Sequence, residues 1–249
     1  MVDYSKYENL KFSDFKKMAL DDNLSCFEKI GFPDSYREGS GPSILRDIET
    51  KLTNLKGRNK TVLDIGAGCS ELPILLTNRC GDQKHKLYLV DSEEMLALLP
   101  DKTGVEKIPG YFPEIAGLFD NLTGNVDVIL VYSVIQYVFV EANLWKFIDR
   151  SLSLLAEGGQ ILIGDIPNIS KRKRFFSSEA GVQFHKKFMK TETPPIVNYD
   201  QIENCQIDDS VIQAIVQRAR IQGFDAYILP QSPDLPMANR REDILIVRP

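Results

Sequence analysis

Hydrophobic residues along the chain recur with two different spacings. Short apolar runs predict strands at 61–64, 86–90, 105–108, 126–131, 160–164, 226–229 and 243–247. Between these runs, apolar residues three and four positions apart predict helices at 44–55, 71–79, 93–99, 144–155 and about 208–223. Gly57, Gly158 and Gly223 follow three of the helices, and Asp208 or Asp209 is placed to cap the last one.

The alternation of strands and helices predicts an α/β fold, a doubly wound Rossmann-like sheet of seven strands with helices on both faces. No helix separates the last two strands, so we expect a mostly parallel sheet with an antiparallel last strand. Residues 1–57 read as an N-terminal helical cap, with a helix at 14–20, and residues 58–249 as the main domain. The connection at 166–207 is too long for a simple loop and is expected to act as a lid.

The segment VLDIGAGCSE at 62–71 combines a strand, a carboxylate, a glycine turn and the start of a helix. Glycines allow a ligand to approach the backbone closely. Asp64, just before the turn, would repel the pyrophosphate of a dinucleotide. It would attract the ammonium and sulfonium of S-adenosylmethionine, so the turn favours that cofactor. A simple strand–helix turn is the alternative for the motif taken alone.

The bulk properties exclude several classes of function. A formal net charge of −5 over 249 residues argues against general nucleic-acid binding. Four scattered cysteines and two histidines, His85 and His185, predict reduced thiols and no metal site. There is neither a secretion signal at the N-terminus nor an apolar stretch of membrane-spanning length. A cytoplasmic protein with no membrane segment is therefore expected.

The order of these features resembles the class I S-adenosylmethionine-dependent methyltransferases over about residues 58–249. The segments GDIPNISKRKRFFSSEAG at 164–181 and ILPQSPDLPMANRREDILIVRP at 228–249 further resemble small-molecule methyltransferases encoded with bacterial surface-carbohydrate genes. The first resemblance implies S-adenosyl-L-methionine as the cofactor. The second implies a sugar-type acceptor.

The resemblance also implies roles for individual residues. Asp64, Gly66 and Gly68 match the loop that holds the methionine part of the cofactor, although Cys69 and Ser70 replace residues more common there. Asp91 ends the second strand and matches the acid that accepts hydrogen bonds from both ribose hydroxyls. Ser92, which follows it, is a further expected cofactor-binding residue. A helix N-cap is the alternative role for Asp91.

Adenine and methyl-side contacts follow from the same resemblance. The stretch after the third strand lacks the acid that often reads adenine, so Tyr111, Phe112 or a backbone group must take its place. At the end of the fourth strand, Tyr132 and Ser133 are expected to border the transferring methyl group.

Substrate contacts are expected from two further segments. Gln136 and Tyr137 follow the fourth strand and are candidates for the acceptor, with a capped loop as the alternative. Tyr36 and Arg37, in the N-terminal cap, are candidates for the methionine carboxylate or the substrate.

Methyl transfer to a carbon activated by sulfonium depends mainly on alignment, which can supply about 7–11 kcal/mol. A sugar hydroxyl also needs a general base, worth about 10²–10⁴-fold. The candidates are Asp165, which ends the fifth strand, and His185, which lies in the insertion and titrates near neutrality. For Asp165 the alternative role is a structural hydrogen-bond acceptor. For His185 the alternative is an exposed helix residue. His85 precedes the second strand and is expected at the surface.

The insertion has a charge opposite to that of the chain. Seven basic residues between Lys171 and Lys190 face one acid, Glu179. An anionic sugar or sugar nucleotide would suit this segment, with Arg172 and Arg174 as binding residues. The alternatives are a solvated basic face, or stacking of RNA bases on its aromatic residues.

The function expected from the sequence is methyl transfer from S-adenosylmethionine to a small, anionic, carbohydrate-type acceptor, with oxygen as the acceptor atom. Two alternatives remain open. One is an NAD-dependent oxidoreductase on a Rossmann sheet, and the other is a non-catalytic cofactor- or RNA-binding module. The sequence does not indicate an oligomeric state.

Overall fold

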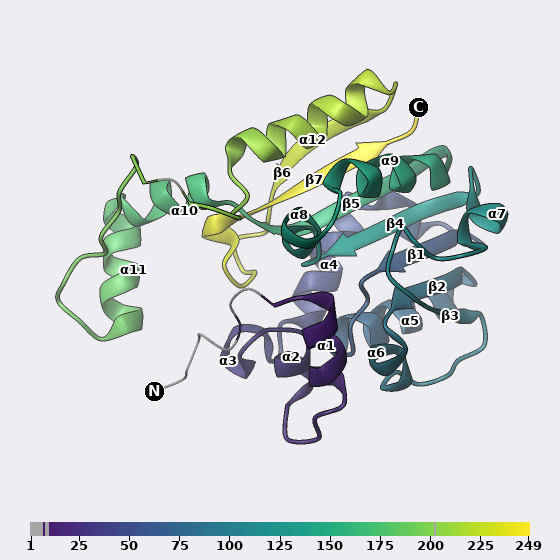
Figure 1. The fold of residues 1–249 in the computed structure, drawn as a ribbon, viewed down its shortest axis with the longest axis horizontal. Coiled ribbons are helices and arrows are strands. Elements are labelled where there is room, and N and C mark those ends of the chain that lie inside the picture. The colour runs from purple at the N-terminus through teal and green to yellow at the C-terminus, as the bar shows by residue number, and fades with distance from the viewer. Residues whose placement is uncertain (1–6, 8–9, 202) are drawn as a thin grey trace.

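A computed structural model describes residues 7, 10–201 and 203–249. Its seven strands form one sheet in the order β3-β2-β1-β4-β5-β7-β6 (Figure 1). The strands are β1 (Thr61–Ile65), β2 (Lys86–Asp91), β3 (Val105–Pro109), β4 (Val126–Tyr132), β5 (Leu155–Pro167), β6 (Asp225–Pro230) and β7 (Arg241–Val247).

Helices precede, connect and follow the strands. Those before β4 are α1 (Phe12–Ala19), α2 (Cys26–Lys29), α3 (Asp34–Arg37), α4 (Gly41–Lys51), α5 (Glu71–Gln83), α6 (Glu93–Ala97) and α7 (Leu118–Leu122). Those after β4 are α8 (Ile135–Glu141), α9 (Leu144–Leu154), α10 (Ile169–Phe176), α11 (Glu179–Met189) and α12 (Asp209–Ile221). The 3-10 helices η2 (Thr53–Lys56) and η3 (Ala238–Arg240) precede β1 and β7.

The expected sheet is confirmed, including its one reversed strand. β1 pairs in parallel with β2 and β4, whereas β7 pairs antiparallel with both β5 and β6. β7 therefore lies between β5 and β6, and β6 forms the edge. Because β1 to β4 all run the same way, their carboxyl ends meet along one edge, where open α/β sheets bind ligands.

Alternate residues of each strand face opposite sides of the sheet, and each side has its own core. Leu63, Ile129 and Ile161 pack with residues of α8, α9 and α12. Val62 and Leu130 pack on the other side with residues of α4 and α5. Both faces are covered by helices, which explains why the central strands read as continuous apolar runs.

The N-terminal segment divides into two parts. Helices α1, α2 and α3 lie together beyond the carboxyl ends of the strands (Figure 1). Helix α4 instead belongs to the core of the sheet, because Ile44 and Ile48 pack in the same cluster as Val62. The domain boundary at residue 57 stays a prediction.

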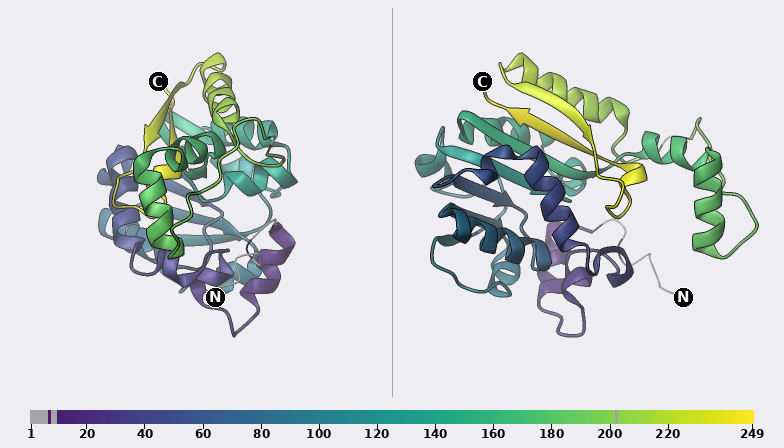
Figure 2. Two further views of the ribbon diagram at one scale, coloured as in Figure 1. Left: turned by 90° about the vertical axis from the view of Figure 1, so that its left-hand side faces the viewer. Right: turned by 180° about the vertical axis from the view of Figure 1, so that it is seen from behind.

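The insertion at 166–207 begins inside β5 and then forms α10 and α11. Helix α11 projects away from the sheet in both the front and back views (Figures 1 and 2). Across the described ranges 7, 10–201 and 203–249, every helix is too short or too polar to span a bilayer.

The expected position of His85 at the surface is wrong. His85 is 4% exposed. Its Nδ1 accepts a hydrogen bond from the backbone N–H of Lys60 at 3.0 Å, and its Nε2 lies 3.2 Å from the carbonyl oxygen of Leu55. The imidazole joins the turn before β1 to the start of β2, and both of its ring nitrogens are occupied by backbone.

Candidate active site

A deep pocket lies at the carboxyl ends of β1, β2 and β4. It encloses about 1140 Å³ of empty space, its open mouth included. The sheet contributes the glycine turn, Asp91 and Tyr132, whereas α1 to α3 contribute Phe12 and Arg37. No described residue of the insertion lines this pocket. In this structure the N-terminal helices cover the pocket, and the role of 166–207 as a lid stays a prediction.

The glycine turn leaves no room for side chains. Gly66 and Gly68 have φ of +75° and +66°, a conformation that favours glycine. A Cβ on Gly66 would lie 2.4 Å from Cγ2 of Val134, and one on Gly68 would lie 2.8 Å from Cγ2 of Ile30. The turn therefore needs glycine both for its backbone conformation and for close packing beneath the N-terminal helices.

Replacing Gly66 with alanine is expected to destabilise the protein by about 2–5 kcal/mol. The left-handed conformation costs about 1–2 kcal/mol and the overlap with Val134 about 1–3 kcal/mol. Urea denaturation measures the loss. In the double variant with Val134→Ala, the stability lost through the overlap with Val134 should be recovered. The loss caused by the left-handed backbone conformation should remain. A Gly66→Ala protein as stable as the wild type would show that the turn is misplaced.

Asp91 ends β2 and its carboxylate borders the glycine turn. One oxygen accepts from the backbone N–H of Gly68 at 2.8 Å, and the other accepts from that of Ser92 at 2.6 Å. The N-cap of α6 is Ser92, whose hydroxyl accepts from the N–H of Met95. Asp91 is thus not used as the cap and lines the pocket, whereas Ser92 is buried below it. Burial raises the pKa of Asp91 and the two N–H donors partly offset this.

Asp64 lies within β1, below the turn, and is 3% exposed. Its side chain does not line the pocket. Burial, followed by the nearby charge of Asp91, raises the pKa of Asp64 to about 8. The carboxyl group is therefore mostly protonated at neutral pH, and its expected contact with the cofactor stays a prediction.

Aromatic rings form one wall of the pocket. Tyr111 and Phe112, after β3, both line it, as does Phe12 of α1. The rings of Phe12 and Tyr111 meet edge to face with centroids 4.9 Å apart. Phe112 is 5% exposed and also packs against Phe147 in the core. This wall suits a flat heterocycle.

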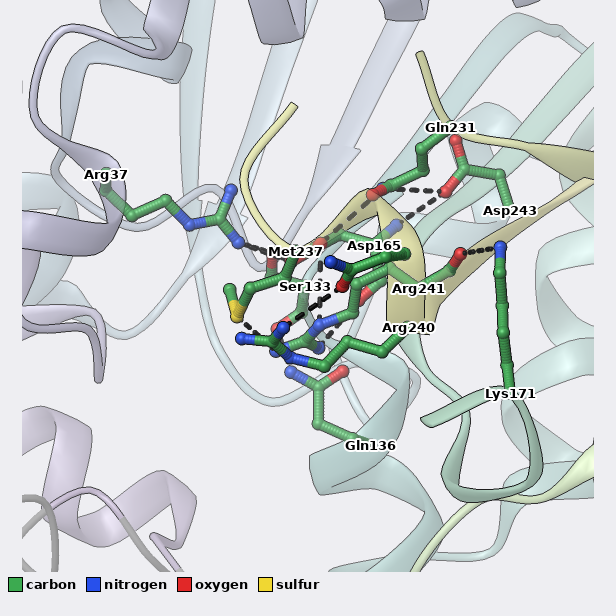
Figure 3. A network of polar contacts seen from close by, with 11 residues as sticks. Arg37, Ser133, Gln136, Asp165, Lys171, Gln231, Met237, Arg240, Arg241 and Asp243 are labelled. Carbon is green, nitrogen blue, oxygen red and sulfur yellow. Dashed lines mark hydrogen bonds and ion pairs between the residues drawn. The ribbon is translucent and has the colours of Figure 1, made fainter. Parts of the chain in front are cut away.

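A buried network closes the pocket where β4 and β5 end (Figure 3). Arg37 donates to the hydroxyl of Ser133 at 2.9 Å and pairs with the carboxylate of Asp165. The Ser133 hydroxyl donates in turn to Asp165 at 2.5 Å. Ser133 and Asp165 have φ of +62° and +57°, and such strained non-glycine residues cluster at functional sites.

The charges around Asp165 determine its protonation. Burial alone would raise the pKa of Asp165, but the charges of Arg37 and Arg241 and the Ser133 hydroxyl leave it below its ordinary value. The carboxylate is 1% exposed and does not line the pocket. An ionised, fully bonded carboxylate is a weak general base, so Asp165 is better placed to hold Arg37 and Ser133 in position.

Of the expected substrate residues, two line the pocket. Arg37 does so, with its guanidinium centre 4.1 Å from the centroid of Phe32. Its Nε is buried and has no hydrogen-bond partner in the described part of the chain. Tyr137 lines the pocket beside Phe15. Gln136 lies behind this surface and donates to the carbonyl of Ser133.

The structure does not bring the remaining candidates to the pocket. His185 and Arg172 line a separate cleft on α10 and α11. Arg174 is exposed and forms a forked ion pair with Asp209. Tyr36 faces another cleft, where its ring lies 6.3 Å from that of Phe188.

Several residues that line the pocket or bond to Asp165 were not predicted from the sequence. Phe12 and Phe15 of α1 are spaced three apart and so share one helix face, a signal that was present. Gln231 and Asp243, which bond to each other and to Asp165, gave no local signal. Among the described residues, no group of three or more His, Cys, Asp or Glu side chains could hold a metal ion.

Known proteins resemble this chain in structure and not in sequence. No family model matches the chain, and no curated protein sequence matches it.

Solved structures do match. The plantazolicin methyltransferase BamL, solved with a desmethylplantazolicin analogue and S-adenosylhomocysteine, is 13% identical with a TM-score of 0.60 over 98% of this chain and 97% of its own. A Methanococcus maripaludis protein provisionally described as an S-adenosylmethionine-dependent methyltransferase is 16% identical, with a TM-score of 0.53 over 99% and 94%. A provisionally described methyltransferase, solved with the Haloferax volcanii activator Trm112, is 11% identical with a TM-score of 0.57 over 95% and 98%.

At these identities the likeness shows the fold. It covers almost the whole chain. The chain has the class I fold of the S-adenosylmethionine-dependent methyltransferases.

Proposed function

We propose that this protein is an S-adenosylmethionine-dependent methyltransferase. The observation that carries the proposal is the carboxylate of Asp91, which lines the pocket beside the glycine turn. A carboxylate there offers two oxygens to a pair of ribose hydroxyls. Structural neighbours solved with S-adenosylhomocysteine support the same cofactor.

The lining residues fit the cofactor part by part. The turn at Gly66 and Gly68 leaves space at the backbone for the methionine part, and Asp91 would hold the ribose. Tyr111 and Phe112 would pack on the adenine. Arg37, with a buried and unpartnered Nε among the described residues, would bind the methionine carboxylate. When bound, S-adenosylmethionine supplies a methyl group already activated by its sulfonium.

The acceptor is proposed to be a small acidic molecule of carbohydrate type, methylated on oxygen. The basic insertion has seven cationic residues against one acid between Lys171 and Lys190, and this supports an anionic acceptor. Four of the seven, Lys171, Lys173, Arg174 and Lys186, pair with acids outside the segment, so the support comes from the other three. Tyr132 and Ser133 end β4 at the pocket and would border the reacting atoms. The carbohydrate character rests on the sequence resemblance alone.

The chain's contribution to the reaction is positioning. Asp165 holds Arg37 and Ser133, so it is proposed as a positioning residue rather than as the base. His185 as general base stays a prediction that requires α11 to move toward the pocket. Tyr132, Tyr137 and Phe15 would exclude water from the transferring methyl.

Binding of S-adenosylhomocysteine is expected to tighten as the pH rises from 6 to about 8. Asp64 has a pKa of about 8 in the free protein, and the ammonium of the ligand favours its ionised form, so binding releases a proton. Affinity should then level off above that pH. Calorimetric titrations at several pH values measure the slope. Asp64→Asn should abolish it, and a slope retained in that variant would assign the proton to another group.

Calorimetry and a transfer assay test the proposal together. S-adenosylhomocysteine and NAD are titrated into the full chain, and a methyl-labelled donor is then incubated with a panel of sugar nucleotides, acidic sugars and tRNA. We expect binding of the first ligand only and label on an acidic sugar compound. NAD binding alone would support an oxidoreductase. Cofactor binding with label on tRNA would support an RNA-binding role. Cofactor binding with no transfer to any acceptor would support a non-catalytic cofactor-binding module.

A further inference from the structure

A second cleft lies beside the first, between α3, α10, α11 and the loop joining β6 to β7. It encloses about 1320 Å³ of empty space, its open mouth included. Its walls include Tyr36, Lys171, Phe184, Phe188, Gln231 and Arg240. The cofactor proposed for the first pocket makes no use of this space.

Arg240, the last residue of η3, is a half-buried cation with no acid partner among the described residues. Its one side-chain hydrogen bond among the described residues goes to the side-chain oxygen of Asn239, and no described carboxylate lies within 4.0 Å of it. Burial lowers the pKa of Arg240, and the charges of Arg241 and Arg172 lower it further. A guanidinium crowded by two others is stabilised when an anion binds between them.

Aromatic rings stand next to this charge. The Arg240 guanidinium lies 5.9 Å from the ring centroids of both Phe176 and Phe184. Phe184 stacks on Phe188 with centroids 5.8 Å apart and planes 7° apart, and Phe188 is 47% exposed. A flat or apolar part of a ligand could cover these rings while its acidic group meets Arg240.

One buried network borders both this cleft and the first pocket. Tyr36 and Arg37 are neighbours on α3, and they face the second cleft and the first pocket respectively. Gln231 lines the second cleft and donates to Asp243 at 3.0 Å and to Asp165 at 3.5 Å. Asp165 in turn holds Arg37 and Ser133 (Figure 3). An acceptor bound in this cleft would have to displace part of this network to reach a methyl group in the first pocket.

We propose that this second cleft is the acceptor site and that Arg240 binds the acceptor's phosphate or carboxylate group, with Phe184 and Phe188 covering its flat or apolar part. The inference rests on the proposed methyltransferase function. The sequence predicted Arg174 as a residue that binds an acidic acceptor, but Arg174 is paired with Asp209. We assign that role to Arg240 instead. Arg172 contributes its charge from the neighbouring cleft.

Calorimetric titration of three probes into the full chain tests the site. The probes are inorganic phosphate, phenyl phosphate and benzoate, each with and without S-adenosylhomocysteine. Wild-type protein should bind phenyl phosphate more tightly than inorganic phosphate. Comparing the affinities for benzoate and phenyl phosphate shows whether the site prefers a carboxylate or a phosphate. Arg240→Gln should weaken the binding of phenyl phosphate by about tenfold or more, the loss of one charge-assisted hydrogen bond. Phe184→Ala should weaken binding of phenyl phosphate and leave that of inorganic phosphate unchanged.

Arg58→Gln is the matched control, because Arg58 is exposed before β1, at the opposite end of the sheet. It should bind all three probes as the wild type does. Equal affinities in Arg240→Gln and wild type, or equal losses in Arg240→Gln and Arg58→Gln, would overturn the anion site. The protein could also bind phenyl phosphate through Arg240 and yet fail to bind S-adenosylhomocysteine. That result would overturn the methyltransferase function, and with it the cleft's role as acceptor site.

Discussion

Replacing Asp91 with alanine is expected to weaken binding of S-adenosylhomocysteine by at least about a hundredfold. The carboxylate is proposed to accept hydrogen bonds from both ribose hydroxyls, and hydrogen bonds to a charged group contribute about 1.5–3 kcal/mol each. It also accepts from the backbone N–H of Gly68 at 2.8 Å, so its loss loosens the glycine turn. Calorimetry on the purified variant measures the change.

Two companion variants separate the ribose contact from general damage. Asp91→Asn keeps the shape and one oxygen acceptor, so its loss of affinity should lie between those of wild type and Asp91→Ala. Asp101→Ala removes an exposed carboxylate that pairs with Lys107, and it should bind the ligand as the wild type does. An unchanged dissociation constant in Asp91→Ala would show that the ribose lies elsewhere.

Replacing Arg37 with methionine is expected to lower the free energy of unfolding by about 3 kcal/mol. The partners Arg37 and Asp165 are 6% and 1% exposed, and removing one member of a buried pair leaves an uncompensated charge that costs about 3–5 kcal/mol. Arg241, 3.8 Å from Asp165, retains part of the compensation, which favours the lower end of that range. Urea denaturation measures the difference.

The double variant Arg37→Met with Asp165→Asn removes both charges and should be more stable than Arg37→Met alone. Arg174→Met breaks an exposed ion pair with Asp209 and should cost less than about 1 kcal/mol. If Arg37→Met is no less stable than Arg174→Met, the pair is not buried as described. The affinity of Arg37→Met for S-adenosylhomocysteine then reports separately on the methionine carboxylate.

Elements with strong local signals were predictable from the sequence. The run at 126–131 corresponds to β4 because a strand covered on both faces is apolar throughout. β5 is longer than the predicted 160–164, because the strand begins directly after α9 and pairs with β4 from Leu155. The paired glycines at 158–159 marked the end of a helix in the sequence, whereas they lie within the strand.

Some residues of the candidate site could likewise be predicted from local sequence, and others could not. Asp91 and the glycine turn are adjacent to the strands they follow, so their positions could be read from local sequence. The network of Arg37, Asp165, Gln231 and Asp243 joins segments that lie far apart in the chain, and no local pattern reports such contacts. Arg240 could not be predicted for the same reason, because its charge, which has no acid partner among the described residues, faces a cleft that forms only where α3, α11 and η3 come together.

A crystal structure of the protein with S-adenosylhomocysteine tests the central claim most directly. We predict the ligand in the pocket at the carboxyl ends of β1, β2 and β4, with both ribose hydroxyls on Asp91 and the homocysteine part against Gly66 and Gly68. Its sulfur should face Tyr132 and Ser133. A ligand bound outside this pocket, or a ribose that makes no contact with Asp91, would contradict the proposal.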